Sequence, residues 1–453
     1  MDSLKSANQL PNNPDHRPQT TDYYLIRYAE IALKGKNRRW FEDRLAQNIL
    51  HSLPKTQNLK PKIQNLHSQL LLKTNPQLTG QSLITNHLSK TFGIAWFAPV
   101  VVSSLDLDQI TASSLSLLAS NLPPKPDKKP ITFAVRVTRH HKSYPLTSRE
   151  LEIETGSIIA KQFKLKVDLT HPDLTLYIEI FKDQALLYTE KIPGPGGLPV
   201  GTAGKALCLL SGGFDSVAAA YSMAKRGLQI DFLHFHVFDK PNQLKQTKVW
   251  SIAQFLSPIV HARTLYTVSC SQFQSKLKHL DKKYRSQKLI LSRRFMMRTA
   301  LQLAQQSGYQ AIITGDSLGQ VASQTLSNLT AVNEVLTQRE QYLTGIPEVQ
   351  SREGSSCNGE RLSPQYTRYN NIQDTKQPIP LFRPLIGMDK VDIINLVKQI
   401  GLYDEVIKPY QDCCSLAATH PATHANLPLI HKLESSLSLP TFTPEPIPLH
   451  IGS

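Results

Sequence analysis

The feature that most constrains the fold is a short segment near the middle of the chain, LLSGGFDS at residues 209–216. An apolar stretch, KALCLL, leads into two adjacent glycines, and a helical pattern begins directly after them. Glycine permits the tight turn that lets main-chain N–H groups and a helix N-terminus face one phosphate group. No Lys-Ser or Lys-Thr pair follows, so the segment is not a Walker A loop. It predicts another kind of pyrophosphate-binding unit, unless the glycines form only a turn capped by Ser and Asp.

The sequence around this segment has the pattern of a parallel sheet with crossover helices. A helical pattern covers residues 217–226, and apolar strands follow at residues 230–238 and 311–314. Strands that alternate with helices are typical of α/β domains. We therefore expect an α/β domain over residues 205–425.

Two later segments interrupt or follow that pattern. Residues 337–377 are polar and rich in Gly, Ser, Asn and Pro, which predicts an insertion or disorder. Helical periodicity then resumes in DKVDIINLVKQIGL, and Gly401 is its expected C-cap. Residues 426–453 are expected to form a C-terminal tail.

The chain before residue 205 shows two successive α+β patterns. Residues 1–20 are polar and predicted to be disordered, residues 21–100 and 101–194 form the two units, and a Gly/Pro-rich linker spans 195–204. A Pro/Lys-rich linker at residues 121–130 interrupts the second unit. The expected strands are 23–28, 66–74, 93–102, 131–139, 174–181 and 185–192, and the expected helices are 40–53, 82–92 and 148–162.

Length and composition limit the class of protein. The chain has 453 residues, more than one ordinary hydrophobic core accommodates. Its net charge of +16 favours a polyanionic partner. Five cysteines are too few for a disulfide framework in a chain of this size. The sequence has neither a membrane-length apolar run nor a signal peptide at its start, so we expect a cytoplasmic protein that does not use a membrane.

Two basic segments favour RNA as that partner. Because Lys and Arg contacts to phosphates dominate non-specific RNA affinity, clustered basic side chains beside aromatic residues predict a backbone-contacting surface. A solvated charged face is the alternative for either segment by itself. The candidate RNA-binding residues are Lys34, Lys36, Arg38 and Arg39 within residues 21–100 and Arg136, Arg139 and Lys142 within residues 101–194.

Several longer motifs extend the argument from the glycine segment to a family. SGGFDS resembles the PP-loop of ATP pyrophosphatases, which adenylate a carbonyl oxygen and release pyrophosphate. RYAEIALKGKNRRWFE, GPGGLPVGTAGK, SRRFMMR, TGDSLGQVASQT, RPLIGMDK and DCC then follow in the order found in tRNA 4-thiouridine synthetases, the ThiI family of tRNA sulfurtransferases. The resemblance covers roughly residues 22–335 and 378–415.

That resemblance implies a domain arrangement. The family has a ferredoxin-like domain, a THUMP RNA-binding domain and a PP-loop domain, which we expect at residues 21–100, 101–194 and 205–425. Some members carry a rhodanese-like domain in addition. The residues after Cys414 are too few for one, so the chain resembles the shorter form.

The expected nucleotide site combines the glycine segment with residues implied by the resemblance. Asp215 is a candidate ligand for Mg²⁺ that bridges the phosphates. The full set of expected ATP-binding residues is Leu209, Leu210, Ser211, Gly212, Gly213, Asp215, Ser216, His234, Phe235, Arg293, Gly315 and Gln324. The alternatives are a core position for His234 and a solvated helix position for Arg293.

The resemblance also implies the residues that handle sulfur. A family cysteine passes persulfide sulfur from a cysteine desulfurase to the activated uridine, and Cys413 matches it by following Asp412. The adjacent Cys414 is the alternative. Lys390 matches the family's functional lysine, whose charge favours a thiolate or stabilises the leaving adenylate. The predicted catalytic residues are therefore Cys413, Lys390 and Asp215. A zinc site at Cys413, Cys414, His420 and His424 is the alternative, but it matches no common ligand spacing.

The resemblance thus implies a tRNA uracil 4-sulfurtransferase that uses ATP and Mg²⁺, acts on tRNA and forms a homodimer. In some members the same sulfur chemistry serves thiamine thiazole synthesis. Three other functions stay open: another PP-loop RNA-modifying enzyme, such as a lysidine or 2-thiouridine synthetase; an RNA-binding protein without catalysis; and a sulfur carrier for thiamine alone.

Overall fold

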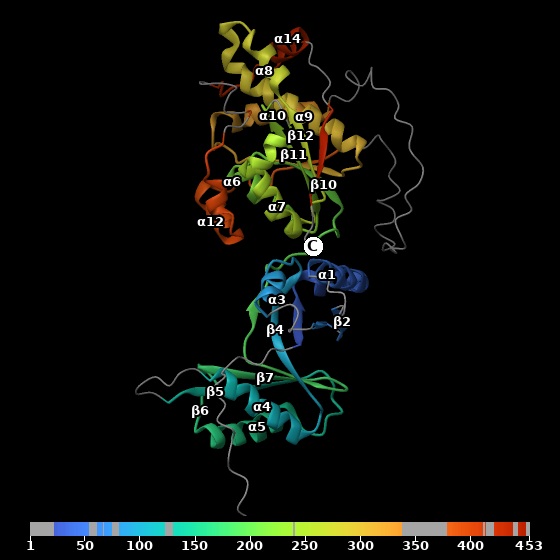
Figure 1. Ribbon diagram of the computed structural model, residues 1–453, viewed down its shortest axis with the longest axis vertical. Helices are drawn as coiled ribbons and strands as arrows, with labels where there is room; N and C mark the ends of the chain where they lie inside the picture. The colour runs from blue at the N-terminus through green and yellow to red at the C-terminus, as the bar shows by residue number, and fades with distance from the viewer. Residues whose placement is uncertain are drawn as a thin grey trace, which may run out of the picture. The chain divides into compact units, whose positions relative to one another are not determined.

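The computed structural model describes residues 22–53, 61–66, 68–74, 81–122, 130–238, 241–337, 378–410, 413, 421–437 and 443–449. The described chain forms two compact units (Figure 1). The first takes its residues from 1–28, 55–89 and 94–194, and the second from 29–54, 90–93 and 195–453. The tail predicted at residues 1–20 lies outside the described residues, as does the predicted insertion from residue 338 onward.

The first unit is built on one sheet, which has nine strands in the described part of the chain. They are β1 (Tyr23–Tyr28), β2 (Lys62–Asn65), β3 (Leu70–Lys73), β4 (Ile94–Ser103), β5 (Thr132–Arg139), β6 (Lys166–Val167), β7 (Leu174–Ile180), β8 (Ala185–Tyr188) and β9 (Ile192–Pro193). Their order is β2-β3-β1-β4-β8-β7-β5-β6, and β9 pairs with β4 beside this path.

The long strand β4 joins the two halves of this sheet. It pairs antiparallel with β1, with Tyr23 opposite Val100, and its last residues pair with β8, with Val102 opposite Leu186. The boundary predicted at residue 100 therefore falls inside β4. The half formed by β2, β3, β1 and β4 has the strand order of a ferredoxin-like sheet and includes α3 (Gln81–Leu88).

Two helices cover the other half of the first unit. They are α4 (Leu107–Asn121) and α5 (Ser148–Phe163). α5 begins with a capping box in which Thr147 and Glu150 each satisfy the other's backbone N–H. Buried residues of both helices, among them Ile110 and Leu151, form one hydrophobic cluster with β5 and β7.

The second unit contains a six-stranded sheet in its described part. Its strands are β10 (Lys205–Leu209), β11 (Gln229–His236), β12 (Thr264–Ser269), β13 (Ala311–Ile313), β14 (Leu381–Phe382) and β15 (Glu445–Pro448). Their order is β14-β13-β10-β11-β12-β15, and only β15 in this sheet runs antiparallel to its neighbour.

Helices pack on both faces of this sheet because successive residues of its strands point in opposite directions. Ala206 and Cys208 join one hydrophobic cluster with α6 and α7, whereas Leu207 joins another with α8 and α9 (Figure 1). The helices of the second unit are η1 (Glu30–Asn37), α1 (Arg38–Ser52), α6 (Phe214–Lys225), η2 (Pro241–Gln246), α7 (Lys248–Val260), α8 (Ser271–Lys278), η3 (Lys282–Gln287), α9 (Lys288–Gln306), η4 (Ala322–Gln324), α10 (Leu326–Thr337), α12 (Lys390–Ile400), α13 (Tyr403–Val406) and α14 (Leu427–Leu437).

The strand order places a topological switch point beside β10. The chain passes from β10 to β11 and β12 on one side, and β13 then pairs on the opposite side of β10. Ligands of open α/β sheets bind at the carboxyl ends of the strands at such a point. The glycine segment follows β10 and Gly315 follows β13, so both expected ligand-binding segments lie at this switch point.

The C-terminal segment differs from the expectation. Residues 426–453 were expected to be a tail, but they supply α14 and the edge strand β15. α14 buries Ile430 and Leu433 in the cluster on the α9 face, and Ile447 pairs with Leu265 of β12. Apolar residues spaced along a short helix, such as Ile430 and Leu433, therefore give this segment enough burial to fold.

Candidate nucleotide site and its surroundings

The loop between β10 and α6 is held by the hydroxyl groups of two serines. The Ser216 hydroxyl accepts a hydrogen bond from the Ser211 main-chain N–H at 3.2 Å and donates one to the Gly213 carbonyl at 3.1 Å. The Ser211 hydroxyl accepts from the Gly213 N–H at 3.3 Å. These bonds fix the loop at the N-terminus of α6, where the helix dipole favours an anion.

Two glycines are required by the shape of this region. Gly212 has a φ of +79°, and a Cβ atom there would lie 2.8 Å from Val249 Cγ2. A Cβ atom on Gly315 would lie 2.5 Å from the backbone carbon of Asp215. The segment after β13 therefore packs directly against the first turn of α6, which only glycine permits.

Asp215, in the first turn of α6, is paired with a side chain from a distant segment. Its Oδ1 accepts a hydrogen bond from Lys390 Nζ at 2.7 Å, and its Oδ2 accepts one from Gln320 Nε2 at 2.9 Å. Lys390 is the first residue of α12, and its ammonium also lies 5.5 Å from the centre of the Phe214 ring. The structure thus brings two of the three predicted catalytic residues together at the glycine loop.

A second carboxylate, Asp316, lies between two arginines. It is buried, it accepts hydrogen bonds from Arg383 Nε and the Thr314 hydroxyl, both at 2.9 Å, and it forms an ion pair with Arg293. Burial by itself would raise the pKa of Asp316, but Arg293 and Arg383 together lower it below its ordinary value. Arg293 also donates to the Ser323 carbonyl at 2.8 Å, so this ion pair fixes the η4 loop.

His234 occupies the end of β11 and links two segments. Its Nδ1 lies 2.7 Å from the Leu210 carbonyl oxygen and its Nε2 lies 2.8 Å from the Tyr410 hydroxyl. The Leu210 carbonyl can only accept, so Nδ1 carries the proton and Nε2 accepts from Tyr410. Burial lowers the pKa of His234 to about 4, which keeps the ring neutral. The neighbouring Phe235 side chain packs on Phe295 instead, so only its backbone faces this end of the sheet.

Several buried polar atoms near the loop have no hydrogen-bond partner among the described residues. They are Gln320 Oε1, Gln324 Oε1 and Arg383 Nη2. Buried polar atoms are almost always paired, so such a group of unpaired atoms beside the strand ends indicates a polar ligand. These unpaired polar atoms, the glycine loop and the helix N-terminus together fit a nucleoside triphosphate.

Cys413 lies in a different neighbourhood. It is 2% exposed and belongs to the hydrophobic cluster on the α8 face of the sheet, with Phe273 and Ile430. Its carbonyl oxygen accepts a hydrogen bond from Gln274 Nε2 of α8 at 3.2 Å. The structure thus does not place the Cys413 side chain in the Asp215–Lys390 cluster on the α6 face. Cys414, the alternative thiol, lies outside the described residues.

The described cysteines and metal-ligating residues show neither a disulfide nor a metal cluster. Cys208, Cys270 and Cys413 are all buried and form no disulfide among the described residues. No group of three His, Cys, Asp or Glu residues in the described ranges has a geometry that could hold a metal ion. Of the residues considered for a zinc site, Cys414 and His420 fall outside those ranges.

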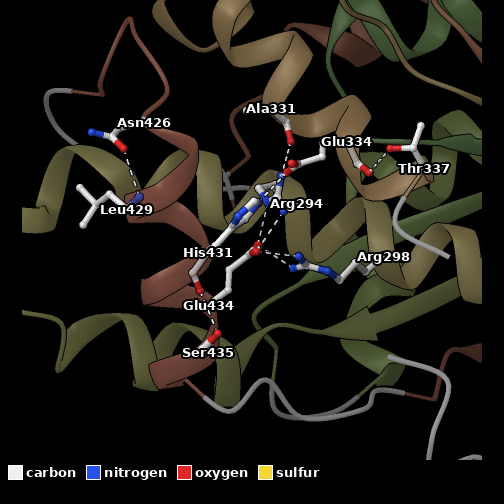
Figure 2. A network of polar contacts seen from close by, with 10 residues as sticks. All are labelled: Arg294, Arg298, Ala331, Glu334, Thr337, Asn426, Leu429, His431, Glu434 and Ser435. Atoms are coloured by element: carbon white, nitrogen blue, oxygen red, sulfur yellow. Dashed lines mark hydrogen bonds and ion pairs between the residues drawn. The ribbon is translucent and has the colours of Figure 1, made fainter. Parts of the chain in front are cut away.

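An ion-pair network anchors α14 to α9 and α10 (Figure 2). Arg294 is fully buried and pairs with Glu434 at 2.8 Å and with Glu334 at 2.7 Å. Arg298 also pairs with Glu434, at 2.6 Å, and His431 lies 2.8 Å from Glu334. Burial would raise the pKa of Glu434, but the two arginines lower it. The helix that follows the Cys413 segment is therefore fixed by charge pairing as well as by apolar contacts.

The basic residues expected to bind RNA fall in both units. In the second unit, Lys36 and Arg39 are exposed, whereas Arg38 pairs with Glu42 at 2.8 Å and the Lys34 ammonium lies 5.1 Å from the Phe41 ring centre. In the first unit, Lys142 is exposed, and Arg136 is exposed but also donates to the Leu169 carbonyl. Arg139 donates to the carbonyl oxygens of Tyr144 and Leu146. Arg139 therefore serves mainly to shape its own loop.

Arg136 also lines a pocket of about 570 Å³ in the first unit. The pocket is lined by basic and aromatic side chains that include Arg27, Trp96, Tyr177 and Lys191. Lys191 Nζ lies 4.0 Å from the Tyr177 ring centre and 5.0 Å from that of Trp96, and its burial lowers its pKa. Cations beside accessible aromatic rings are suited to an unpaired nucleotide, with its phosphate and its base.

One buried acid balances the charge of this pocket. Glu179 accepts hydrogen bonds from Gln69 Nε2 at 3.0 Å and the Tyr188 hydroxyl at 2.8 Å, lies 2.7 Å from His140 Nε2, and pairs with Arg27 at 3.7 Å. Burial would raise the pKa of Glu179, but these partners lower it. Glu179 therefore orients Arg27 at the wall of the pocket.

Three residues that shape the candidate nucleotide site are not indicated by the sequence patterns. Gln320 and Arg383 lie inside motifs that were recognised, TGDSLGQVASQT and RPLIGMDK, but nothing in those motifs indicated which residues face Asp215 or Asp316. Tyr410 stands shortly before the DCC motif. A buried histidine needs a hydrogen-bond partner for its second nitrogen, and that need was the available signal for a partner such as Tyr410.

A glycine loop lies at the switch point of a parallel sheet, and α+β structure precedes this sheet in the chain. These features define a PP-loop nucleotide-binding protein with separate N-terminal domains. Family models match all three parts: the ThiI ferredoxin-like domain over residues 23–98, the THUMP domain over residues 105–190, and "Thiamine biosynthesis protein (ThiI)" over residues 201–339 and 363–439. The predicted fold class is thereby confirmed.

Comparison with known proteins narrows the class to one family. The chain is 34% identical to the probable tRNA sulfurtransferase of Alkaliphilus oremlandii over 92% of this chain and 94% of that protein. It is 32% identical to the one from Moorella thermoacetica over 92% of this chain and 93% of that protein. The chain belongs to the ThiI family of tRNA sulfurtransferases, and it is an enzyme of that class.

A solved structure agrees with this assignment. The fold matches the crystal structure of a 4-thiouridine synthetase–RNA complex with bound ATP, with a TM-score of 0.74 and 30% sequence identity. The match covers 94% of this chain and 100% of that one. Among the described helices, none combines the length and apolar character needed to cross a bilayer.

Proposed function

We propose that this protein transfers sulfur to a uridine of tRNA, at the eighth nucleotide, in an ATP-dependent reaction that gives 4-thiouridine. The observation that carries the proposal is the contact between Lys390 and Asp215 at the glycine loop. This contact supports the proposal because it brings a cation and a carboxylate to the N-terminus of α6, where we propose that the phosphates bind. Adenylation needs both charges there.

The residues around the loop divide the work of binding ATP. The main-chain N–H groups of residues 211–213 and the first turn of α6 bind phosphate oxygens, because they carry the positive end of the helix dipole. Backbone groups at Leu210 and His234 border the base, and Gln324 and Arg383 supply the unpaired polar atoms. Arg293 acts by holding Asp316 and the η4 loop.

Asp215 and Lys390 act on the phosphates during adenylation. Asp215 has an accessible carboxylate of the kind that holds Mg²⁺, and this ion, when bound, supplies charge neutralisation at the phosphates. Lys390 releases Asp215 and turns to the phosphate that becomes the adenylate. The uridine O4 forms a bond to the α-phosphorus, and pyrophosphate leaves.

Cys413 is the proposed sulfur carrier. A cysteine desulfurase delivers the outer sulfur of a persulfide to Cys413, and that sulfur attacks C4 of the adenylated uridine while AMP departs with the oxygen. A second thiol then attacks Cys413 Sγ, forms a disulfide with it, and frees the sulfur on C4 as the thiocarbonyl. The second thiol comes from Cys414, another cysteine of the chain, the desulfurase or a small thiol reductant.

The pocket of the first unit and the exposed basic residues are proposed to hold the tRNA. Lys36, Arg39 and Lys142 are exposed and carry charge that can meet phosphates, and the pocket beside Arg136 accepts an unpaired nucleotide by stacking and charge. Support comes from the RNA bound in the similar 4-thiouridine synthetase structure.

The test is a nucleoside assay on unmodified tRNA with ATP, Mg²⁺, cysteine and a cysteine desulfurase. We expect 4-thiouridine at the eighth nucleotide, formed together with AMP and pyrophosphate. An Asp215→Asn variant should release little pyrophosphate. Pyrophosphate release that depends on tRNA but yields no thiolated base would contradict the sulfur-transfer step. A modified cytidine or 2-thiouridine would indicate another PP-loop enzyme.

A further inference from the structure

The segment from Gly315 to Gln324, which follows β13 and ends with η4, is called the nucleotide loop below. It meets the segment that follows Cys413, described from residue 421, at the start of α10. The η4 turn ends at Gln324, and α10 begins at Leu326. The chain that follows the Cys413 region reaches the same place at Ala422. One buried side chain of α10, that of Asn328, contacts both segments.

The contacts of Asn328 are specific. Its Nδ2 donates to the Ala322 carbonyl of η4 at 2.8 Å and to the Ala422 carbonyl at 2.8 Å, and the residue is 1% exposed. Its Oδ1 has no hydrogen-bond partner among the described residues. Both neighbours are carbonyl oxygens, which can only accept, so the amide is oriented with both N–H groups toward them. No apolar or acidic residue of this size makes the same pair of bonds.

Neighbouring bonds fasten the same two segments. The Thr325 hydroxyl donates to the Thr423 carbonyl at 2.7 Å, and the Ala425 N–H donates to the Ser327 hydroxyl at 3.0 Å. The Ala422 N–H itself donates to the Ser286 carbonyl at 3.0 Å. The segment after Cys413 is therefore tied to the start of α10 at several points, and Asn328 is the tie that also reaches the nucleotide loop.

The helix α9 also connects the nucleotide loop to the C-terminal part of the chain. Arg293 holds Asp316 and Ser323 of the nucleotide loop, and the next residue, Arg294, holds Glu434 of α14 (Figure 2). The network of Figure 2 thus fixes the helix that follows the Cys413 segment to the helix that carries Arg293. A movement of one segment relative to the other must break charge pairs in a buried site.

We propose that Asn328 is a positioning residue that keeps the Cys413 segment in register with the nucleotide loop, so that adenylation is followed by sulfur transfer. The proposal rests on the function proposed above. Asn328 touches neither ATP nor sulfur; it acts through Ala322 and Ala422. Loss of its two bonds removes the contact that spaces Ala322 from Ala422 and loosens the local fit of the two segments, while the other ties keep each segment formed.

The test measures how many thiolated tRNAs form for each pyrophosphate released. Asn328→Ala removes both bonds, and Asn328→Ser keeps a single shorter donor. The matched control is Asn48→Ala, because Asn48 is also buried and also donates its amide to a carbonyl, that of Val200 at 3.1 Å. We expect pyrophosphate release near the wild-type rate and a product ratio roughly tenfold lower in Asn328→Ala, since small misplacements of reacting groups cost large factors in rate.

The outcomes separate this role from a structural one. A wild-type ratio in Asn328→Ala, or equal losses of pyrophosphate release and thiolation, would overturn the positioning role. If Asn328→Ala does not fold, Asn328→Ser decides: an intermediate ratio supports the role and an unchanged ratio overturns it. Wild-type enzyme that releases pyrophosphate without 4-thiouridine overturns the proposed function, and this role with it, which distinguishes the two failures.

Discussion

Lys390 Nζ lies 2.7 Å from Asp215 Oδ1, so the first residue of α12 neutralises the carboxylate in the first turn of α6. A lysine at a helix N-terminus is unfavourable beside the helix dipole, and an aspartate there is favourable. The ion pair lets the favourable position of Asp215 offset the unfavourable position of Lys390. It also holds both side chains at the glycine loop, where the proposed reaction needs a cation and a carboxylate.

Replacement of Lys390 tests that role. We expect Lys390→Met to lower the rate of tRNA-dependent pyrophosphate release by roughly a hundredfold, because a charge that stabilises the transition state is lost. The stability of the fold should change by less than about 1 kcal/mol, since the pair is partly exposed. Lys398→Met, on the exposed side of the same helix, is the control. Equal rates in the two variants would contradict the assignment.

Gly212 tests the shape of the loop. Gly212→Ala introduces a side chain at a φ of +79°, 2.8 Å from Val249, and we expect ATP binding to weaken by at least tenfold in a calorimetric titration. Gly308→Ala is matched in strain, with a φ of +69°, but nothing lies within 4 Å of its Cβ position. Both variants should lose about 1 kcal/mol of unfolding free energy from strain. Similar ATP affinity in the two variants would show that the loop does not bind the nucleotide.

Two histidines with lowered pKa values, His234 and His261, predict how stability depends on pH. The pKa of His234 and that of His261 are both lowered from 6.5 to about 4, chiefly by burial; for His261 the nearby His51, Arg44 and Arg263 contribute to the same shift. The unfolded chain binds these protons more readily, so stability is full above about pH 6.5 and falls as the pH drops toward 4.

Chemical denaturation at pH 7 and pH 5 measures this loss. In the His261→Asn variant the difference between the two pH values should be smaller than in wild type by about 2 kcal/mol, because one of the two groups is removed. Asparagine tolerates the left-handed φ of 55° at that position. An unchanged pH dependence would exclude His261 as a source of it.

The pocket of the first unit predicts a salt-dependent effect on tRNA alone. Lys191→Met should raise the KM for tRNA and reduce the slope of binding against salt by about one unit if Lys191 contacts a phosphate, with kcat unchanged. Lys166→Met, an exposed lysine outside the pocket, serves as the control. A change in kcat without a change in tRNA affinity would place Lys191 outside the RNA surface.

Much of the catalytic unit could be predicted from local sequence. Strand, two glycines and helix form a local unit, so β10, the loop and α6 appear where expected, and Gly401 has the left-handed φ of 85° expected of a C-cap. The local sequence pattern also predicts the strand β1 at Tyr23–Tyr28 and the helix α5 from Ser148. In each case neighbouring residues determine the element.

Contacts between distant segments cannot be predicted from local sequence in the same way. Tyr410 reaches His234 and Arg383 reaches Asp316 only after the whole sheet is assembled. The sequence pattern does not predict the helix α4, because the apolar residues of α4 are interspersed with Ser and Thr. The C-terminal segment appeared to be a tail because the partners that stabilise it, such as Arg294 for Glu434, lie far away in sequence.

The most direct test of the central claim compares Cys413→Ser with Cys414→Ser and wild type in the assay with tRNA, ATP, Mg²⁺, cysteine and desulfurase. Both 4-thiouridine and pyrophosphate should be measured in the same samples. We predict that Cys413→Ser still releases pyrophosphate but forms no 4-thiouridine, because adenylation depends on Asp215 and Lys390 and sulfur transfer on Cys413. Normal 4-thiouridine formation by Cys413→Ser would contradict the account.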